Sequence, residues 1–339
     1  MTSPVPSPSA HPAATLTDRF NRRHNYLRIS VTDRCNLRCV YCMPADGLVW
    51  RERDEILRYE EIERIAAIFV GHGVDKIRLT GGEPTVRRNL HHLIGRLRQL
   101  PGLRTLLMST NGVLLAKQAA SYRAAGLDGL NISLDTLRAD RFARMTLRDN
   151  HAEVLAGIHA ALAAGFDSVK INVVVMHGVN DDELVDFAAF AAAHPLEVRF
   201  IEFMPFDRND WSTGGLVPYG EMRRRIEAAF TLTQLDAGPN AVAKEFAIAG
   251  GAGRLGFVTS MTENFCAGCN RLRLTADGKM KNCLFSTGEA DLRAPLRAGA
   301  TDAELTAIIH QCVLGKWVGH PPMEELASLQ NRSMIQIGG

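Results

Sequence analysis

Short runs of β-branched and other apolar residues alternate with segments whose apolar residues recur at helical spacing. The strand-like runs cover residues 27–31, 76–80, 105–109, 129–133, 169–175 and 197–201. The helical pattern is clearest over residues 59–70, 114–125, 154–164 and 183–193. Strands that alternate with helices indicate a parallel sheet in an α/β fold. Six repeats predict an incomplete (βα)6 partial TIM barrel, with a doubly wound sheet as the alternative, because a closed barrel needs eight.

One face of several predicted strands is polar. Residues on one face of a strand recur at every second position. Polar residues follow this spacing in four series, namely Arg28, Ser30 and Thr32; Lys76, Arg78 and Thr80; Asn131, Ser133 and Asp135; and Lys170 with Asn172. A closed barrel instead fills its interior with branched apolar side chains. The sequence therefore predicts a wet, charged cavity inside the partial barrel.

The regular alternation of strands and helices ends after about Pro218. A helical segment over residues 219–229 precedes strand-like, Gly-rich sequence up to Val258 and then a group of cysteines. We therefore predict a barrel domain of residues 21–225 and a C-terminal α+β extension of residues 226–339. Residues 1–20 are rich in Pro, Ser, Ala and Thr, and we predict that they form a disordered tail rather than a secretory signal.

The composition excludes several classes of protein. The 339 residues are 46% hydrophobic and 22% charged, which is typical of a globular protein. The net charge of +2 is too small to indicate a protein that binds nucleic acid or a membrane surface. No apolar run reaches the roughly 18 to 20 residues that span a bilayer. We expect a soluble, cytoplasmic protein with no nucleic-acid and no membrane partner.

Six of the seven cysteines fall in two tight groups. In a reducing compartment this clustering indicates metal ligands rather than disulfides. The seventh, Cys312, recurs at helical spacing with Leu305 and Ile309. We interpret Cys312 as a buried core thiol rather than a ligand.

The first cysteine group, Cys35, Cys39 and Cys42, follows the first predicted strand, at the end where parallel α/β folds place their chemistry. Three thiolates can bind three irons of a cubane cluster and leave the fourth iron open to a substrate. A structural zinc site would need a fourth ligand, and the nearest histidines are His24 and His72. The spacing therefore favours an iron-sulfur cluster.

The motif Cys-x3-Cys-x2-Cys, with Tyr41 before its last cysteine, resembles the signature of the radical S-adenosylmethionine (SAM) superfamily. The sequence Gly81-Gly82-Glu83-Pro84 resembles the glycine-rich motif of the same superfamily. There, the open iron of a 4Fe-4S cluster chelates the methionine group of SAM, and one electron cleaves SAM to a 5′-deoxyadenosyl radical. The resemblance implies SAM contacts for Tyr41, Gly82, Ser133 and Met204. Without it, Tyr41 and Met204 would be interpreted as packing residues and the Gly-Gly pair as a turn.

The second cysteine group consists of Cys266, Cys269 and Cys283. The pair Asp277-Gly278 predicts a two-residue hairpin turn that pairs Ala276 with Lys279. This register sets Cys283 opposite about Leu272, and therefore beside Cys269. We favour a second cluster with one free iron over the alternative, a zinc knuckle completed by Cys312 or His310.

The sequence from Cys266 to Lys279, Cys-x2-Cys-Asn-Arg-Leu-Arg-Leu-Thr-Ala-Asp-Gly-Lys, resembles the GTP 3′,8-cyclase family, and the match runs from about Arg28 to Gly339. The resemblance implies two 4Fe-4S clusters and SAM as cofactors and GTP as substrate. The 5′-deoxyadenosyl radical would take hydrogen from C3′ of GTP, and the C3′ radical would attack C8 of guanine. The product is (8S)-3′,8-cyclo-7,8-dihydroguanosine 5′-triphosphate, in the first step of molybdenum cofactor biosynthesis. A homodimer, cyclic pyranopterin monophosphate synthase as the next enzyme, and a flavodoxin or ferredoxin as electron donor are implied in the same way.

A nucleoside triphosphate inside a cavity requires cations that match its phosphate oxygens. Arg28, Arg78, Lys170 and Arg199 lie in predicted strands, where surface is scarce and unpaired burial is costly. The resemblance implies GTP contacts for Arg28, Arg78, Ser109, Lys170, Arg271, Leu272 and Arg273. It also implies catalytic roles for Arg273 and for Gly338 and Gly339, because the glycine tail of the family enters the active site.

Two other functions remain open from the sequence. A radical SAM peptide-modifying enzyme with an auxiliary cluster would explain the cysteines but not the interior cations. A zinc-dependent binding module would require zinc alone at the cysteine groups, which metal analysis of anaerobically purified protein distinguishes from iron and sulfide.

Overall fold

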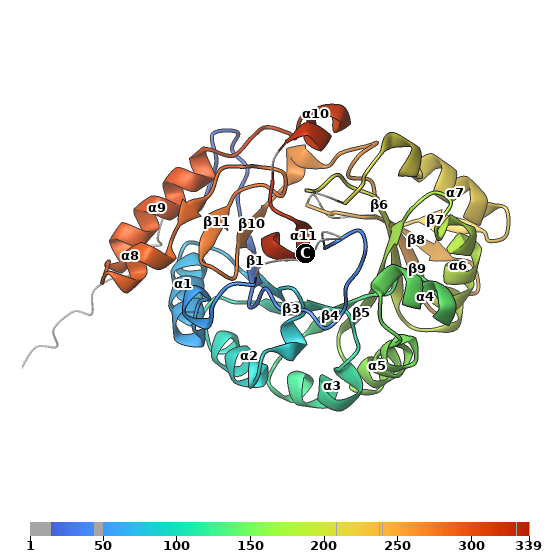
Figure 1. The fold of residues 1–339 in the computed structure, drawn as a ribbon, viewed down its shortest axis with the longest axis horizontal. Coiled ribbons are helices and arrows are strands. Elements are labelled where there is room, and N and C mark those ends of the chain that lie inside the picture. The colour runs from blue at the N-terminus through green and yellow to red at the C-terminus, as the bar shows by residue number, and fades with distance from the viewer. Residues whose placement is uncertain are drawn as a thin grey trace, which may run out of the picture.

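The computed structural model describes residues 15–43, 50–207, 209–236, 238, 240–329 and 331–338. Its strands form one twelve-stranded sheet in the order β12-β11-β10-β1-β2-β3-β4-β5-β6-β9-β8-β7. The six central strands are parallel and comprise β1 (Tyr26–Ser30), β2 (Lys76–Thr80), β3 (Thr105–Thr110), β4 (Gly129–Ser133), β5 (Ser168–Val175) and β6 (Glu197–Glu202). The predicted strands and the partial barrel are confirmed (Figure 1).

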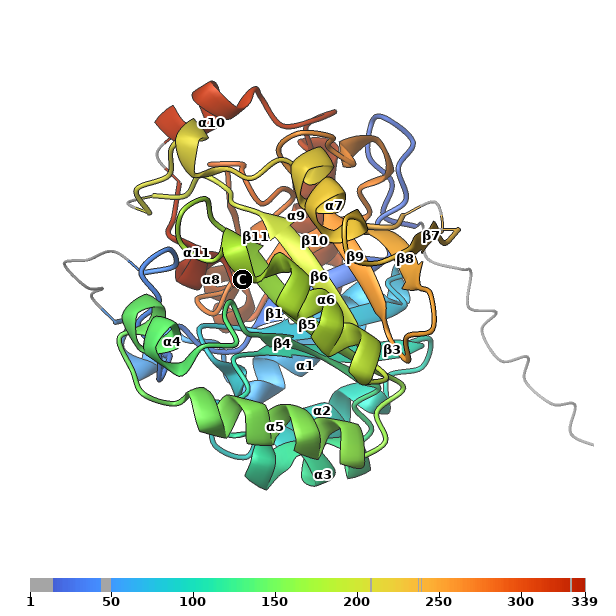
Figure 2. The same ribbon diagram turned by 90° about the vertical axis from the view of Figure 1, so that its right-hand side faces the viewer.

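Helices cover the outer face of the curved sheet (Figures 1 and 2). They are α1 (Tyr59–Gly71), α2 (Leu90–Arg98), α3 (Leu115–Ala124), α4 (Ala139–Thr146), α5 (His151–Ala163) and α6 (Leu184–Ala193). In α1, Ile62, Ile65 and Phe69 recur at helical spacing and are buried in the core. The apolar face of each helix thus lies between helix and sheet, which leaves the inner face of the sheet free to line a cavity.

The residues after the sixth strand extend both edges of the barrel sheet. At one edge, β9 (Arg254–Val258) is parallel to β6, and β8 (Lys244–Ile248) and β7 (Leu232–Gln234) continue antiparallel. At the other edge, β10 (Arg271–Leu274) is parallel to β1 and is followed by β11 (Lys279–Lys281) and β12 (Ala290–Asp291). Because the sheet runs from residues 21–225 into residues 226–339, the division into two domains stays a proposal.

The remaining helices belong to the extension. They are α7 (Tyr219–Glu227), α8 (Arg293–Arg297), α9 (Asp302–Leu314), α10 (Met323–Ser328) and α11 (Met334–Ile337). One-turn 3₁₀ helices lie at Arg53–Glu55, Pro84–Val86, Asp181–Glu183, Thr213–Gly215 and Cys266–Gly268. Helix α11 lies within the ring of strands in the view of Figure 1. Among the described residues, no helix has the length and apolar character needed to cross a membrane.

The predicted hairpin register is wrong by one residue. Arg273 pairs with Lys281 and Leu274 with Met280, so the hairpin loop has three residues instead of two. Gly278 takes up the extra residue in a left-handed conformation, with φ of +78°. The observed register, continued past the strand ends, sets Cys283 opposite Arg271 rather than Leu272.

The prediction of a disordered tail over residues 1–20 does not hold for residues 15–20. Residues 1–14 lie outside the described residues, but Leu16 is fully buried in the core. Asp18, also buried, accepts hydrogen bonds from the main-chain N–H groups of Phe20 and Arg22. The chain is therefore folded onto the barrel from Thr15, because a single leucine and a capped turn anchor it despite the polar composition.

Candidate active site

The partial barrel encloses a cavity of about 700 Å³. Inward-facing residues of the strands, the loops that follow them and α11 form its walls. Its lining includes both cysteine groups, namely Cys35, Cys39 and Cys42 with Cys266, Cys269 and Cys283. The two groups lie more than 200 positions apart in the sequence, and the sheet brings them to one cavity because β10 pairs with β1.

The loop after β1 presents the first three cysteines. The N–H groups of Cys42 and Met43 both donate to the carbonyl of Cys39, at 3.0 Å. Burial, with a smaller contribution from Glu83, raises the pKa of Cys35 to about 11. Burial, with smaller contributions from Cys35 and Asp135, raises the pKa of Cys42 to about 12. Thiols held together in this way are poor free thiolates but suitable ligands for iron, whose positive charge stabilises the thiolate form.

The described His, Cys, Asp and Glu residues include no group of three that could hold one metal ion together. A cubane cluster does not require such convergence, because each thiolate binds a different iron. The donor set of three half-buried cysteines on one cavity wall fits the predicted 4Fe-4S cluster in chemistry.

Glycine at position 82 allows the cysteine loop to approach the end of β2. A Cβ at Gly82 would lie 2.3 Å from the carbonyl oxygen of Arg34, so any other residue would displace the loop. The next residue, Glu83, is fully buried and accepts hydrogen bonds from the hydroxyl of Thr110 and the N–H of Asn111, each at 2.6 Å. Asn111 in turn donates to the Sγ of Cys35 at 3.8 Å. Sequence reasoning noted Glu83 only within the glycine-rich motif and gave no role to Asn111, although polar residues directly after strands were the available signal.

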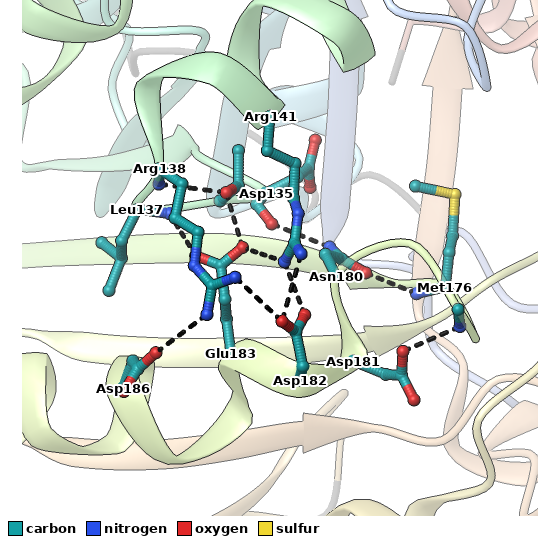
Figure 3. Close-up of polar contacts among 12 residues, drawn as sticks. Asp135, Leu137, Arg138, Arg141, Met176, Asn180, Asp181, Asp182, Glu183 and Asp186 are labelled. Atoms are coloured by element: carbon teal, nitrogen blue, oxygen red, sulfur yellow. Dashed lines mark hydrogen bonds and ion pairs between the residues drawn. The ribbon is translucent and has the colours of Figure 1, made fainter.

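A second network supports the loop after β4 (Figure 3). Asp135 accepts hydrogen bonds from the Tyr41 hydroxyl at 2.6 Å and from the Val174 N–H at 2.8 Å. Burial raises the pKa of Asp135 to about 6. Fully buried Glu183 accepts from Thr136 at 2.6 Å and from the Leu137 N–H at 2.7 Å. The predicted SAM contact Tyr41 is therefore held by hydrogen bonding, beyond simple packing.

The same region holds the cysteine loop through its main chain. The N–H of Arg38 donates to the carbonyl of Thr146 at 2.9 Å, and that of Val40 donates to Met145 at 3.0 Å. The predicted SAM contacts Tyr41, Gly82, Ser133 and Met204 all line the cavity. Tyr41 and Ser133 lie beside Cys39, whereas Met204 packs against the same hydrophobic cluster as Cys283 of the second cysteine group.

The second cysteine group lies among cations. Burial raises the pKa of the Cys269 thiol, but Arg271 and Lys316 outweigh burial and lower the pKa to about 6. The Arg271 guanidinium lies 3.7 Å from the Cys269 Sγ. Buried Lys316 donates to the carbonyls of Arg271 at 2.9 Å and of Asn282. A thiolate at Cys269 is thus favoured before any metal binds, which suits a cluster ligand.

Cations form a band between the two cysteine groups. In the register of β10, β1 and β2, Arg28 lies between Arg273 and Arg78, and we call these three residues the arginine band. Arg78 and Arg273 are buried, and the Nε of Arg28 is buried without a hydrogen-bond partner among the described residues. Burial lowers the pKa of Arg28 to about 10 and also lowers that of Arg273. Cations desolvated in this way without carboxylate partners indicate an anionic ligand.

The opposite wall holds cations that are already paired. Lys170 lies 2.5 Å from Glu197, and Arg199 contacts both Glu197 and, at 3.0 Å, Glu245. An anion that binds to Lys170 or Arg199 would have to displace these carboxylates from the two cations. The Ser109 hydroxyl lies 3.5 Å from the Arg78 guanidinium, beside the arginine band, and Ser109 also lines the cavity.

Comparison with known proteins accounts for this arrangement. Residues 29–191 match the family model of the radical SAM superfamily, and residues 196–321 match that of Molybdenum Cofactor Synthesis C. GTP 3′,8-cyclase, mitochondrial, of Arabidopsis thaliana is 49% identical over 96% of this chain and 83% of its own length. GTP 3′,8-cyclase of Moorella thermoacetica is 48% identical over 96% of this chain and 100% of its own length. The chain belongs to the GTP 3′,8-cyclase family.

Two further similarities define how far the family membership extends. Molybdenum cofactor biosynthesis protein 1 of Homo sapiens is 46% identical over 96% of this chain, and the chain spans 51% of that protein. The solved structure of Streptococcus suis SuiB bound to precursor peptide SuiA superimposes with a TM-score of 0.60, at 15% identity, over 94% of this chain and 72% of SuiB. The likeness to SuiB shows the fold alone. The predicted family, the radical SAM enzyme class and the partial barrel are confirmed, and the cofactors of the family are SAM and two 4Fe-4S clusters.

One residue predicted to contact GTP in this member of the GTP 3′,8-cyclase family faces away from the cavity. Leu272 is fully buried in the core on the other face of β10, because neighbouring residues of a strand point to opposite faces. Arg271 and Arg273 line the cavity on either side of it. The predicted GTP contact of Leu272 stays a proposal, and its buried side chain leaves the main chain of Leu272 to make that contact.

The C-terminal tail of this member of the GTP 3′,8-cyclase family enters the arginine band. The carbonyl of Gly338 accepts a hydrogen bond from Arg273 at 3.3 Å. Gly338 has φ of +88°, and a Cβ there would lie 2.8 Å from the Cβ of Ser30 and 3.0 Å from the Thr80 hydroxyl. Gly339 lies outside the described residues. Both the backbone conformation and the close approach require glycine at position 338.

Proposed function

We propose that this chain binds GTP between two iron-sulfur clusters and converts it to (8S)-3′,8-cyclo-7,8-dihydroguanosine 5′-triphosphate, as the first step of molybdenum cofactor biosynthesis. The observation that carries the proposal is a single cavity that both cysteine groups line, with a band of buried cations between them. A triphosphate supplies the negative charge that the unpaired cations lack, which a peptide substrate or a zinc module would not explain.

In this proposal Cys35, Cys39 and Cys42 hold the cluster that binds SAM, and Tyr41, Gly82, Ser133 and Met204 contact SAM itself. When bound, this cluster and SAM together supply the 5′-deoxyadenosyl radical that removes the C3′ hydrogen of GTP. Cys266, Cys269 and Cys283 hold the second cluster, at which the guanine end of GTP docks. No residue acts as a general base in the hydrogen abstraction.

The work of the remaining residues is to position GTP and to exclude water. Arg28, Arg78 and Arg273 bind the anionic part of the substrate from the arginine band. Ser109, Lys170, Arg271 and the main chain at Leu272 complete the proposed contacts. Catalytic roles are proposed for Arg273, Gly338 and Gly339, because the Gly338 carbonyl accepts from Arg273 and so brings the tail to the proposed GTP site.

Product analysis after anaerobic incubation with GTP, SAM and a reductant tests the function. The expected product is an isomer of GTP, so chromatography must separate it before mass analysis. With GTP carrying deuterium at C3′, one deuterium should appear in 5′-deoxyadenosine, because the hydrogen moves to the 5′ carbon. Unchanged GTP, or 5′-deoxyadenosine without deuterium, would contradict the proposed reaction.

Arg273→Lys should lower GTP affinity by about tenfold or more. A single ammonium cannot reproduce the planar fork with which arginine reaches a phosphate and the Gly338 carbonyl together. The measurement is calorimetric titration of cluster-loaded protein with GTP. Arg96→Lys is the matched control, since Arg96 pairs with Glu60 on the outer helices and lies outside the cavity lining. Equal affinity in Arg273→Lys and the unchanged protein would remove Arg273 from the site.

The assembly and cellular context are also proposed from the family resemblance alone. We expect a homodimer, an electron donor such as a flavodoxin or ferredoxin, and a cyclic pyranopterin monophosphate synthase that takes the product. We place the protein in the cytoplasm, although the Arabidopsis relative carries "mitochondrial" in its name. Fractionation of the source cells tests the location.

A further inference from the structure

Tyr26 is a buried tyrosine of the cavity wall that the proposed reaction does not yet use. It is the first residue of β1, is 7% exposed and lines the cavity. In the sheet register it lies between Arg271 of β10 and Lys76 of β2. Tyr26 thus forms a layer with these two cations. This layer lies two residues along the strands from the layer of Arg28, Arg78 and Arg273.

The Tyr26 hydroxyl is held in place as an acceptor. The Nε of Arg78 donates to it at 2.6 Å. The Lys76 ammonium lies over the ring, 4.8 Å from its centre, which fixes the ring through a cation–π contact. Arg28 of the same strand also interacts with the hydroxyl, so Arg28, Arg78 and Lys76 together set its orientation.

The proton of this hydroxyl has no acceptor on the protein among the described residues. The charged groups that face it are Arg28 on its own strand, Arg78 and Lys76 on β2, and Arg271 with Arg273 on β10, and none of them can accept a hydrogen bond. Burial raises the pKa of Tyr26, but Arg78, Arg28 and Lys76 outweigh it and lower the pKa to about 7. The surroundings thus favour negative charge at this point of the cavity.

We propose that Tyr26 is a further substrate-binding residue, which donates a hydrogen bond to a phosphate oxygen of GTP while its own oxygen accepts from Arg78. The inference rests on the proposed function for its ligand. A phosphate oxygen matches the site because it is an anionic acceptor that satisfies both the hydroxyl and the unpaired Nε of Arg28. The guanine ring offers only neutral acceptors, which would leave the surrounding cations uncompensated.

Tyr26→Phe tests the proposal, because it keeps the ring over Lys76 and removes only the hydroxyl. The affinities of cluster-loaded protein for GTP and for inorganic tripolyphosphate are measured by calorimetric titration, without reductant. Both affinities should fall by about tenfold, since the same lost hydrogen bond to phosphate affects both. In turnover, KM for GTP should rise by a similar factor while kcat changes less than twofold, as expected for a contact made equally before and during the reaction.

Tyr122→Phe is the matched control. Tyr122 is also buried, and its hydroxyl donates to Gln118 at 2.8 Å outside the cavity lining. Cluster content and thermal midpoint should be alike in the two variants, and Tyr122→Phe should bind both ligands normally. Equal affinity for GTP in Tyr26→Phe and the unchanged protein would overturn the proposal, as would a loss for GTP without a loss for tripolyphosphate. If the unchanged protein fails to bind GTP, the proposed function itself is wrong, which is a separate result.

Discussion

Alanine in place of Cys35, Cys39 or Cys42 should lower reductive cleavage of SAM by about a hundredfold or more. Each of these thiols is proposed to bind one iron, and all three are half-buried on one loop. The measurement is release of 5′-deoxyadenosine from anaerobic protein with SAM and reductant, alongside iron and sulfide content. Near-normal release by any of the three variants would contradict the assignment of the first cluster.

The second cysteine group should respond differently. Alanine at Cys266, Cys269 or Cys283 should remove cyclisation of GTP and retain some cleavage of SAM, because the radical forms at the other end of the cavity. Cys312→Ala is the matched control for both groups, since Cys312 packs partly against the core and does not line the cavity. If the second group were structural, its variants would either cyclise GTP normally or lose both activities through unfolding.

Local sequence patterns were sufficient to predict the part of the site around the first cysteine group. The spacing of Cys35, Cys39 and Cys42 and the pair Gly81-Gly82 depend on one loop and one turn, and both lie where the sequence analysis expects them. Polar residues at every second position of the strands correctly predict the polar interior. The same rule reaches Tyr26, two positions before Arg28, but an aromatic residue at a strand start is ordinary core composition and gives no separate signal.

Long-range pairing could not be read from the sequence. The strands β9 and β10 join opposite edges of the barrel sheet, at β6 and β1, and nothing in their composition specifies these partners. The hairpin register failed for a local reason, because Asp-Gly suits a three-residue loop with Gly278 in the left-handed position as well as a two-residue turn. The family motif implies a GTP contact for Leu272 without saying which of its atoms makes it, and alternation along β10 turns its side chain into the core.

Deleting Gly338 and Gly339 should lower cyclisation by about a hundredfold while GTP binding changes little. The deletion removes the carbonyl that accepts a hydrogen bond from Arg273, one of the cations that line the cavity. Two residues without side chains contribute little to the core, so the free energy of unfolding should change by less than about 0.5 kcal/mol. Cluster content, thermal midpoint, GTP affinity and product formation are compared between the full-length and shortened proteins.

Gly338→Ala separates the position of the tail from its presence. The alanine Cβ would meet Ser30 at 2.8 Å in a backbone conformation, φ of +88°, that disfavours any side chain. The tail should therefore leave its place beside Arg273, and cyclisation should fall nearly as far as in the deletion.

Gly299→Ala is the matched control, because Gly299 has φ of +91° but open space around it and lies outside the cavity lining. The control should carry the same backbone strain and cyclise GTP normally. Product formation at the full-length rate in both Gly338→Ala and the deletion would show that the tail has no part in the reaction, even though it lies within reach of Arg273.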